Sequence, residues 1–147
     1  MKGKIRVILK DIYTGEEEIT EYENLLPTAG RTAIGRRLID EIEKYGEGVI
    51  TYGAVGTGTD APQNSDEQLQ TELARKQKAS TSYAANIITI RTFFTASEAV
   101  GNLKEFGLFG EEATSAANSG TLFQRVNIDK VKTNTKTLTI ESIITII

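Results

Sequence analysis

Residues Val49 to Lys78, VITYGAVGTGTDAPQNSDEQLQTELARKQK, decide how the rest of the chain is interpreted. The stretch begins as a run of β-branched residues, which favours a strand. The run breaks on the alternating glycines Gly56 and Gly58, which predict a strand end and a wide turn with positive φ at both positions. The chain before this stretch predicts a hairpin and one helix, and the chain after it predicts a β-meander.

The second half of the stretch carries a helix-capping pattern. The Ser65 side chain can accept from the backbone N–H three residues on, and Gln68 can reach back to the Ser65 N–H. Leu69 and Leu73 stand four residues apart and would share one side of a helix. These features predict a short helix from Ser65 to Lys76.

A β-hairpin is predicted at the start of the chain. Two segments, Lys4 to Lys10 and Glu17 to Glu23, flank a turn at Asp11 to Gly15. The second segment is rich in glutamate, which suits an exposed sheet edge because charge discourages pairing with another chain. Apolar side chains recur at every second position of the first segment, which predicts one buried face: Ile5, Val7 and Leu9.

The clearest helix is predicted from Thr28 to Tyr45. Gly30 and Gly35 each weaken a helix by about 1 kcal/mol relative to alanine. Two interpretations stay open for these glycines: a close approach of the helix to another backbone, or ordinary surface flexibility. The apolar residues recur at the spacing of one helical face: Ile34, Leu38, Ile42 and Tyr45.

Strand patterns dominate the remainder of the chain. They cover Ala85 to Ala96, Thr121 to Val131 and Thr137 to Ile146, and a shorter apolar strand ends at Gly110. The small polar residues of Glu111 to Gly120 predict a mobile loop between strands.

The predicted fold class is α+β, mainly β: an antiparallel β-sandwich-like sheet with one main amphipathic helix and one short helix. We expect a single domain over residues 1–147. Its parts are the N-terminal hairpin in 1–23, the helix in 28–45, and the loop, short helix and β-meander in 49–147. The predicted core contains Ile34, Leu38, Ile42, Ile88, Ile90, Phe94, Leu122, Leu138, Ile140 and Ile144.

Composition argues against several functional classes. The 147 residues include 17 lysines and arginines and 20 acidic residues, for a net charge of −3, so there is no basic footprint for nucleic acid or anionic lipid. The chain has no cysteine and no histidine, and therefore lacks a thiolate nucleophile and the commonest general base and metal ligand. The apolar stretch near Met1 is too short for a signal peptide or a membrane span. We therefore expect no enzyme, no nucleic-acid or membrane partner, and no export signal of the chain's own.

The glycine cluster does not satisfy a phosphate-binding motif. Gly53 to Gly58 matches the start of a P-loop, but Thr59 and Asp60 stand where lysine and Ser/Thr are required. Gly56 to Ala61 matches the dinucleotide fingerprint in spacing, yet Pro62 and a polar loop follow where a helix should begin.

The same loop does not favour a cation site. Asp60, Asn64, Asp66 and Glu67 could offer oxygens to Ca²⁺, but their spacing is not that of an EF-hand. A carboxylate pair for glycoside hydrolysis would need an aromatic-rich cleft, and the chain has no tryptophan. We predict no catalytic, cofactor-binding or metal-binding residues, and we expect asparagine at positions 60 and 66 to leave stability unchanged with or without calcium.

Five short blocks of the sequence carry a family resemblance: Asn24 with Gly30 and Arg31, Ala54 to Gly58, Gln68 to Arg75, Glu98 to Phe109, and Gly120 to Lys130. In these blocks the chain resembles small virion structural proteins of tailed bacteriophages and prophages, of the tail-fibre, baseplate or head-associated type. The resemblance covers about residues 24–145. It implies a non-enzymatic protein that is located in the virion and assembles as a symmetric oligomer.

Two functional hypotheses follow. The first is a phage virion structural subunit, in a tail, fibre attachment, baseplate or capsid decoration, that contacts itself and other virion proteins. A second observation favours self-association: both faces of Ile87 to Phe94 and of Ile143 to Ile147 are apolar, and a second apolar face needs another layer to cover it. The alternative is that two sheets of the same chain enclose both strands. The resemblance gives three as the expected number of subunits. The alternative is a carbohydrate- or receptor-binding β-module with the Glu111 to Gly120 loop as an adaptable rim; a carboxylate hydrolase is a distant third.

Overall fold

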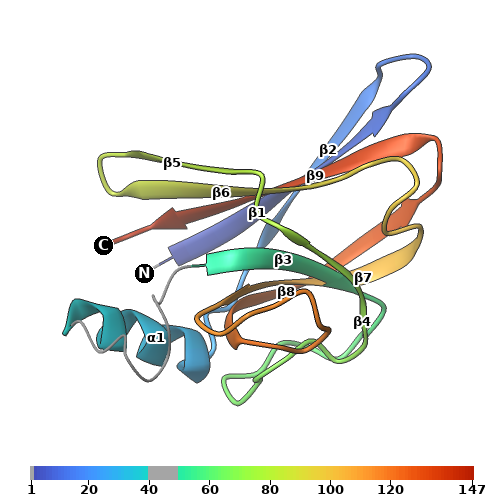
Figure 1. The fold of residues 1–147 in the computed structure, drawn as a ribbon. Helices are drawn as coiled ribbons and strands as arrows, with labels where there is room; N and C mark the ends of the chain where they lie inside the picture. The colour runs from blue at the N-terminus through green and yellow to red at the C-terminus, as the bar shows by residue number, and fades with distance from the viewer. Residues whose placement is uncertain (1, 40–49) are drawn as a thin grey trace.

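The computed structural model describes residues 2–39 and 50–147. Two antiparallel sheets are stacked face to face, and one helix lies against an end of the stack (Figure 1). The predicted fold class, mainly β and sandwich-like, is confirmed. The elements are β1 (Lys2–Asp11), β2 (Glu17–Glu23), α1 (Thr28–Leu38), β3 (Ile50–Gly56), β4 (Glu72–Gln77), β5 (Ser80–Ala84), β6 (Ile87–Phe94), β7 (Gly101–Gly110), β8 (Thr121–Lys132) and β9 (Lys136–Thr145).

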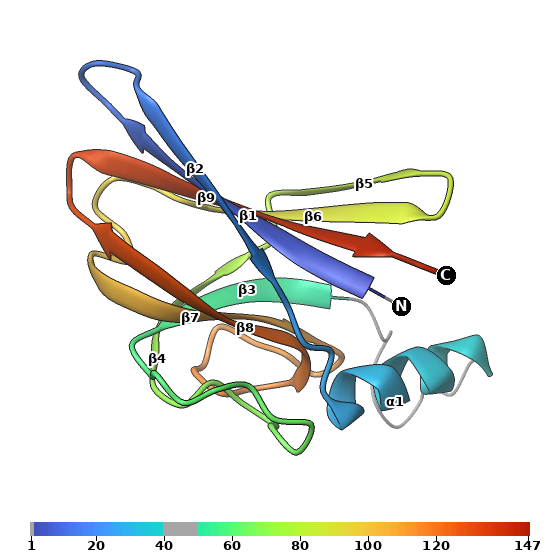
Figure 2. The ribbon, with the colours of Figure 1, turned by 180° about the vertical axis from the view of Figure 1, so that it is seen from behind.

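The sheets have five and four strands. The five-stranded sheet has the order β2-β1-β9-β6-β5, and the four-stranded sheet has the order β4-β3-β7-β8. The predicted hairpin is confirmed as β1 and β2, with β2 at the sheet edge (Figure 2). The inward side chains of β1 are fully or almost fully buried against the other sheet, as the alternation predicts: Ile5, Val7 and Leu9.

The β-meander prediction is wrong, because the chain repeatedly changes sheets. It passes from the four-stranded sheet to the five-stranded one between β4 and β5, returns between β6 and β7, and crosses again between β8 and β9. The last strand, β9, therefore pairs with β1 and β6 and not with β8. A hydrophobic pattern shows which face of a strand is buried, but it does not show which strand lies beside it.

Most of the predicted core is correct. Ile90, Phe94, Leu138, Ile140 and Ile144 are buried between the sheets, and Ile34 and Ile88 are partly buried beside them. Leu122 is also buried, but it belongs to a second cluster on the other side of the four-stranded sheet. Leu38 is 82% exposed, so its assignment to the core is wrong. Ile42 and the predicted last helical turn at Tyr45 lie outside the described residues.

The predicted short helix from Ser65 to Lys76 is wrong. Asn64 and Ser65 form a turn, and the segment from Glu72 onward is β4, paired with β3. The strand β5 has no counterpart among the sequence predictions, because its residues alternate only small polar groups and alanine around Tyr83.

Two glycines of the central stretch have a role different from the predicted one. Gly56 and Gly58 are not among the glycines with positive φ. Instead, a Cβ at Gly56 would stand 2.3 Å from the carbonyl oxygen of Thr71, and a Cβ at Gly58 would stand 2.4 Å from the Gln70 Cβ. These positions are glycine because the returning loop lies directly on the strand end.

The two helix glycines should respond in opposite directions to alanine. A Cβ at Gly30 would stand 2.1 Å from the backbone oxygen of Phe123, whereas a Cβ at Gly35 meets no atom of the described residues within 4 Å. Gly30 is therefore a close approach to another backbone, and Gly35 lies on the surface. We expect Gly30→Ala to cost about 1 to 3 kcal/mol through overpacking, and Gly35→Ala to add up to about 1 kcal/mol through helix propensity. Chemical denaturation measures both, and an equal response would contradict the packing of α1 on β8.

Candidate functional site

A buried carboxylate organises the long loop between β3 and β4. Glu105, on β7, has no exposed surface. Its oxygens accept hydrogen bonds from the backbone N–H groups of Gly58 (2.9 Å), Gln70 (3.0 Å) and Thr71 (2.8 Å). Both ends of the loop are thus bound to one side chain.

The counter-ion of this carboxylate is Arg125 on β8. Its Nε and Nη2 donate to the same Glu105 oxygen at 3.2 and 3.0 Å. Its Nη1 donates to the Asp66 carboxylate at 2.7 Å, and Nη2 also donates to the Asp60 backbone oxygen at 3.0 Å. Glu105 and Arg125 therefore clamp the loop onto the outer face of the four-stranded sheet. Both Glu105 oxygens and all three guanidinium nitrogens of Arg125 have partners within the chain, which suits a structural role for the pair.

The residues weighed as calcium ligands do not converge on a cation site. Asp66 pairs with Arg125, the Asp60 carboxylate accepts from the Gln70 side chain, and the Asn64 backbone oxygen accepts from the Thr28 N–H. Among the described residues, no group of three or more acidic side chains is placed to hold a metal ion.

This arrangement changes the expectation for asparagine at Asp66. The Asp66→Asn variant should lose about 1 to 2 kcal/mol because Arg125, which is almost fully buried, loses a charged partner. Asp60→Asn, at an exposed side chain, should stay within about 0.5 kcal/mol. Calcium should move neither melting temperature. A calcium-dependent rise in the native chain that is absent from Asp66→Asn would contradict this interpretation.

A second buried ion pair secures the Glu111 to Gly120 loop. Arg75 donates to Glu72 at 2.7 Å, and both side chains are almost fully buried. The Arg75 guanidinium also donates to the backbone oxygens of Thr114 (2.9 Å) and Ser119 (3.1 Å) and stacks 4.5 Å from the centre of the Phe109 ring. The loop predicted to be mobile is held down by these contacts.

The two loops cover the outer face of the four-stranded sheet. Under them lies a small second core of Ala54, Leu69, Phe109 and Leu122. Leu69, which was predicted to lie on a helix, fills the space above Gly107, where a Cβ would stand 2.9 Å from it. This face of the molecule is therefore closed by the chain itself.

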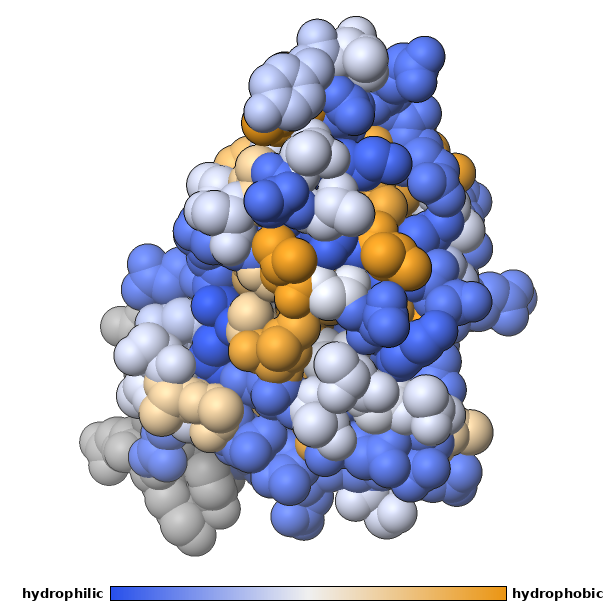
Figure 3. All heavy atoms as spheres, turned by 90° about the vertical axis from the view of Figure 1, so that its right-hand side faces the viewer, coloured by the Kyte–Doolittle hydropathy of each residue, from blue (hydrophilic) through white to orange (hydrophobic). Residues whose placement is uncertain are grey.

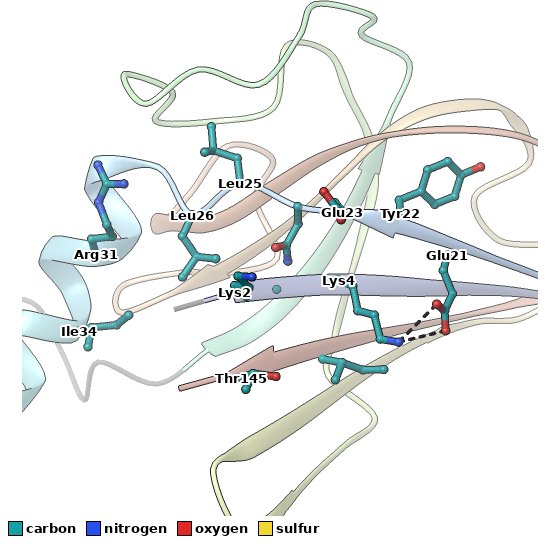
Figure 4. A pocket seen from close by; sticks show the side chains of 13 residues that line it. Lys2, Lys4, Glu21, Tyr22, Glu23, Leu25, Leu26, Arg31, Ile34 and Thr145 are labelled. Atoms are coloured by element: carbon teal, nitrogen blue, oxygen red, sulfur yellow. Dashed lines mark hydrogen bonds and ion pairs between the residues drawn. The ribbon is translucent and has the colours of Figure 1, made fainter. Parts of the chain in front are cut away.

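A groove of about 900 Å³ runs between α1, the start of β1 and the end of β2 (Figure 4). Leu26 and Ile34 line its helix side (Figure 4). Lys4 reaches across to Glu21 on its rim at 3.3 Å. The amide of Asn24 also lines it, and neither amide atom has a hydrogen-bond partner among the described residues. The groove offers contact surface, and its described lining residues include no nucleophile paired with a base.

Lys132 is the most deeply buried lysine that the structure describes. Its Nζ donates to the backbone oxygens of Ala96 (2.9 Å) and Thr133 (3.3 Å), which ties the β6–β7 and β8–β9 connections together. Burial lowers the pKa of Lys132, as in lysines that act as nucleophiles. It does not line the groove of Figure 4, so we assign it the structural role of a tether.

The outer face of the five-stranded sheet is open, and a row of alternating charges crosses it. Cross-strand neighbours place Glu21, Arg6, Glu141 and Arg91 side by side on β2, β1, β9 and β6. Arg6 contacts Glu21 at 3.1 Å and Glu141 at 3.4 Å, and Arg91 contacts Glu141 at 2.8 Å. Hydrogen bonds from Arg6 and then from Lys4 lower the pKa of Glu21.

Apolar side chains stand on both sides of this charged row. Ile19 is 55% exposed, Ile87 is 41% exposed and Phe93 is 38% exposed. Only one face of β6 and β9 is therefore enclosed, because both strands belong to the same sheet. The other face, from Ile19 to Ile87, is the open sheet face, and no described residue covers it.

A further apolar patch lies at the end of the sandwich. Figure 3 looks onto the end at which β6 passes to β7 and β8 turns to β9, and hydrophobic side chains gather near its centre. Leu73, Val100 and Val131 are exposed here. Leu73 would touch a Cβ at Gly101 at 3.5 Å, and Val131 pairs with Asn102.

Comparison with known proteins adds no relative. No family model, curated protein or solved structure matches this chain. No helix in residues 2–39 or 50–147 is long and apolar enough to cross a membrane.

The buried clamp residues escaped the sequence analysis although the sequence carries a signal for them. Glu105 directly precedes the apolar run from Phe106 to Phe109, and Arg125 stands inside LFQRV. A charge within a buried strand requires a partner. Two such charges of opposite sign, with a glycine-rich turn nearby, would have predicted the clamp.

Proposed function

We propose that the protein is a structural subunit of a bacteriophage virion, acting through protein–protein contacts in a tail, fibre attachment, baseplate or capsid decoration. The observation that supports this most is the open sheet face, where Ile19, Ile87 and Phe93 stand exposed on a broad, charge-paired surface. Exposed apolar groups on a face rimmed by polar ones are typical of protein contact sites. The resemblance of the sequence blocks supplies the virion as the setting and the expectation of a homo-oligomer of three subunits.

The interior of the protein suits this role. Its buried charges hold two loops onto a closed face, and the opposite face remains available. A rigid scaffold with one open face can sit between other proteins of a particle without a catalytic centre. The partners proposed are copies of this chain and other virion proteins.

The test is incorporation into particles. Particles from a culture that expresses the chain are purified on a density gradient and their proteins are quantified by mass spectrometry. We expect the chain in a fixed ratio to the other particle proteins. Its absence from particles whose other structural proteins are recovered would overturn the proposal.

One observation favours the alternative, a carbohydrate-binding module. A second groove, of about 800 Å³, is lined by the amides of Asn64, Gln68 and Asn118, and the last belongs to the Glu111 to Gly120 loop. Amides suit sugar hydroxyl groups, but none of the described residues that line this groove is aromatic. A glycan array separates the hypotheses: selective binding that is lost in Asn118→Ala would favour the module.

A further inference from the structure

The strand β5 is a sheet edge without protection. All five of its residues are exposed, and its only strand partner in the described structure is β6. In Figures 1 and 2 no element lies along its outer side. An uncovered edge presents unpaired backbone N–H and C=O groups that can bind another strand.

The other edge strands are charged or covered. Glutamates fill β2, and β8 is covered where Leu25 exchanges backbone hydrogen bonds with Arg125. On β4, charged side chains include Lys76, which pairs with Glu98 at 2.6 Å. Of the four edge strands in the described part of the chain, β5 (Ser80–Ala84) is the one without a charged residue.

The hydrogen-bond phase of the sheet shows which β5 groups are free. The N–H of Ile146 donates to the oxygen of Asn86 at 2.9 Å, so the backbone groups of Asn86 point toward β9. In an antiparallel sheet this direction alternates along the strand, so the backbone groups of Ile87, Thr89 and Arg91 point toward β5. These three residues pair with Ala84, Ser82 and Ser80. The backbone groups of Thr81 and Tyr83 therefore point outward, away from the sheet.

Two outward residues separated by one residue form a self-complementary edge. When two such strands run antiparallel with Ser82 on a two-fold axis, Thr81 of each copy lies opposite Tyr83 of the other. Each opposed pair exchanges two backbone hydrogen bonds, giving four in all. No charged side chain of one β5 meets a like charge of the other, whereas two β2 strands would oppose glutamates.

The side chains fit the same pairing. Tyr83 is 83% exposed, and it lies on the sheet face that carries the partly buried Ile88, its neighbour on β6. A second copy would place Thr81 beside this ring, and aromatic and β-branched residues are favourable cross-strand pairs. This contact gives the otherwise solvated Tyr83 ring a partner.

We propose that β5 binds β5 of a second copy of this chain, forming a two-fold dimer with a continuous ten-stranded sheet. The inference deepens the proposed function, since it names a partner and a contact for the same structural subunit. A two-fold edge contact produces even-numbered assemblies. It therefore differs from the threefold association that the resemblance implies.

The experiment uses single cysteines, because the native chain has none. At the axis, Ser82→Cys would face its own copy in a non-hydrogen-bonded pair, with Cα atoms about 4.5 Å apart, within the range that a disulfide spans. The matched control, Ser80→Cys, stands on the same face of the same strand, but the two copies of that cysteine would lie about 13 Å apart at the rise of a β-strand. Under mild oxidation at micromolar concentration, we expect Ser82→Cys to run at twice the monomer mass in denaturing gels and Ser80→Cys to remain monomeric.

A second pair of variants tests the hydrogen bonds without a disulfide. Thr81→Pro removes an outward N–H that β6 does not use and suits an edge strand, whereas Thr81→Val keeps that N–H. Light scattering should give a dimer mass for the native chain and for Thr81→Val, and a monomer mass for Thr81→Pro with an unchanged circular dichroism spectrum.

Equal cross-linking of the two cysteine variants, or a dimer mass retained in Thr81→Pro, would overturn the β5 pairing. So would a native chain that is monomeric or trimeric. A trimer would still agree with the proposed self-association. Selective cross-linking with absence from particles would support the β5 contact and contradict the virion function.

Discussion

Replacement of Glu105 by alanine should lower the free energy of unfolding by about 3 to 5 kcal/mol, the usual cost of removing one partner of a buried ion pair. The variant leaves Arg125 buried with less of its charge compensated, and it leaves the N–H groups of Gly58, Gln70 and Thr71 without their acceptor. Urea denaturation followed by circular dichroism measures the change.

Two further variants identify the cause. Glu105→Gln keeps one carbonyl oxygen as an acceptor and should lose less than alanine does. Glu112→Ala removes an exposed carboxylate of the same chemistry and should stay within about 0.5 kcal/mol. Limited proteolysis should cut the loop between Gly58 and Thr71 faster in Glu105→Ala than in the native chain. If Glu105→Ala and Glu112→Ala behave alike, the carboxylate does not hold the loop.

Ile90→Ala should cost about 2 to 5 kcal/mol, because it removes buried methyl groups and leaves a cavity between the sheets. Leu38→Ala removes an aliphatic side chain of the same size from α1. Since Leu38 is 82% exposed, its truncation should stay within about 0.5 kcal/mol. The comparison of denaturation midpoints tests the face assignments directly. Equal shifts would mean either that Ile90 is not buried or that Leu38 is not exposed.

Sequence patterns predicted the strands that have one buried face. The alternation of Ile5, Val7 and Leu9 identified β1, and the alternation of Leu138, Ile140 and Ile144 identified β9. The inward residues Ile90 and Ile140 are buried as expected. These predictions succeeded because each of these strands buries one face in the core, so apolar residues recur at every second position of its own sequence.

The segment that became β4 shows where local patterns fail. Glu72 and Arg75 are three residues apart, the spacing of a helical ion pair. In the structure they pair from a strand, because the register with β3 shifts between Val55 and Gly56 and places one extra residue, Leu73, in β4. This bulge returns Glu72 and Arg75 to the same side of the sheet. The sequence alone does not show that this segment pairs with the edge of β3, and that pairing makes it a strand.

The candidate surfaces were predictable only in part. Apolar residues on both faces of β6 predicted that its second face needs another layer to cover it, and the described chain leaves Ile87 and Phe93 on that face exposed. The β5 edge was not predictable, because exposure of its backbone depends on which strand has no neighbour. That property belongs to the order of strands in the sheet and not to any short segment.

The position of β9 sets the order in which this protein can be completed during synthesis. The hairpin β1–β2 is synthesised before the other described strands, yet in the sheet it is joined to β6 only through β9, the last of them. Until Lys136–Thr145 has emerged, β1 has an open side and the hairpin has no sheet to join. The glutamates of β2 discourage the unpaired hairpin from pairing with another nascent chain during this interval, because their like charges repel. Translation must therefore reach β9 before the five-stranded sheet can close, and pairing of such distant segments is slow.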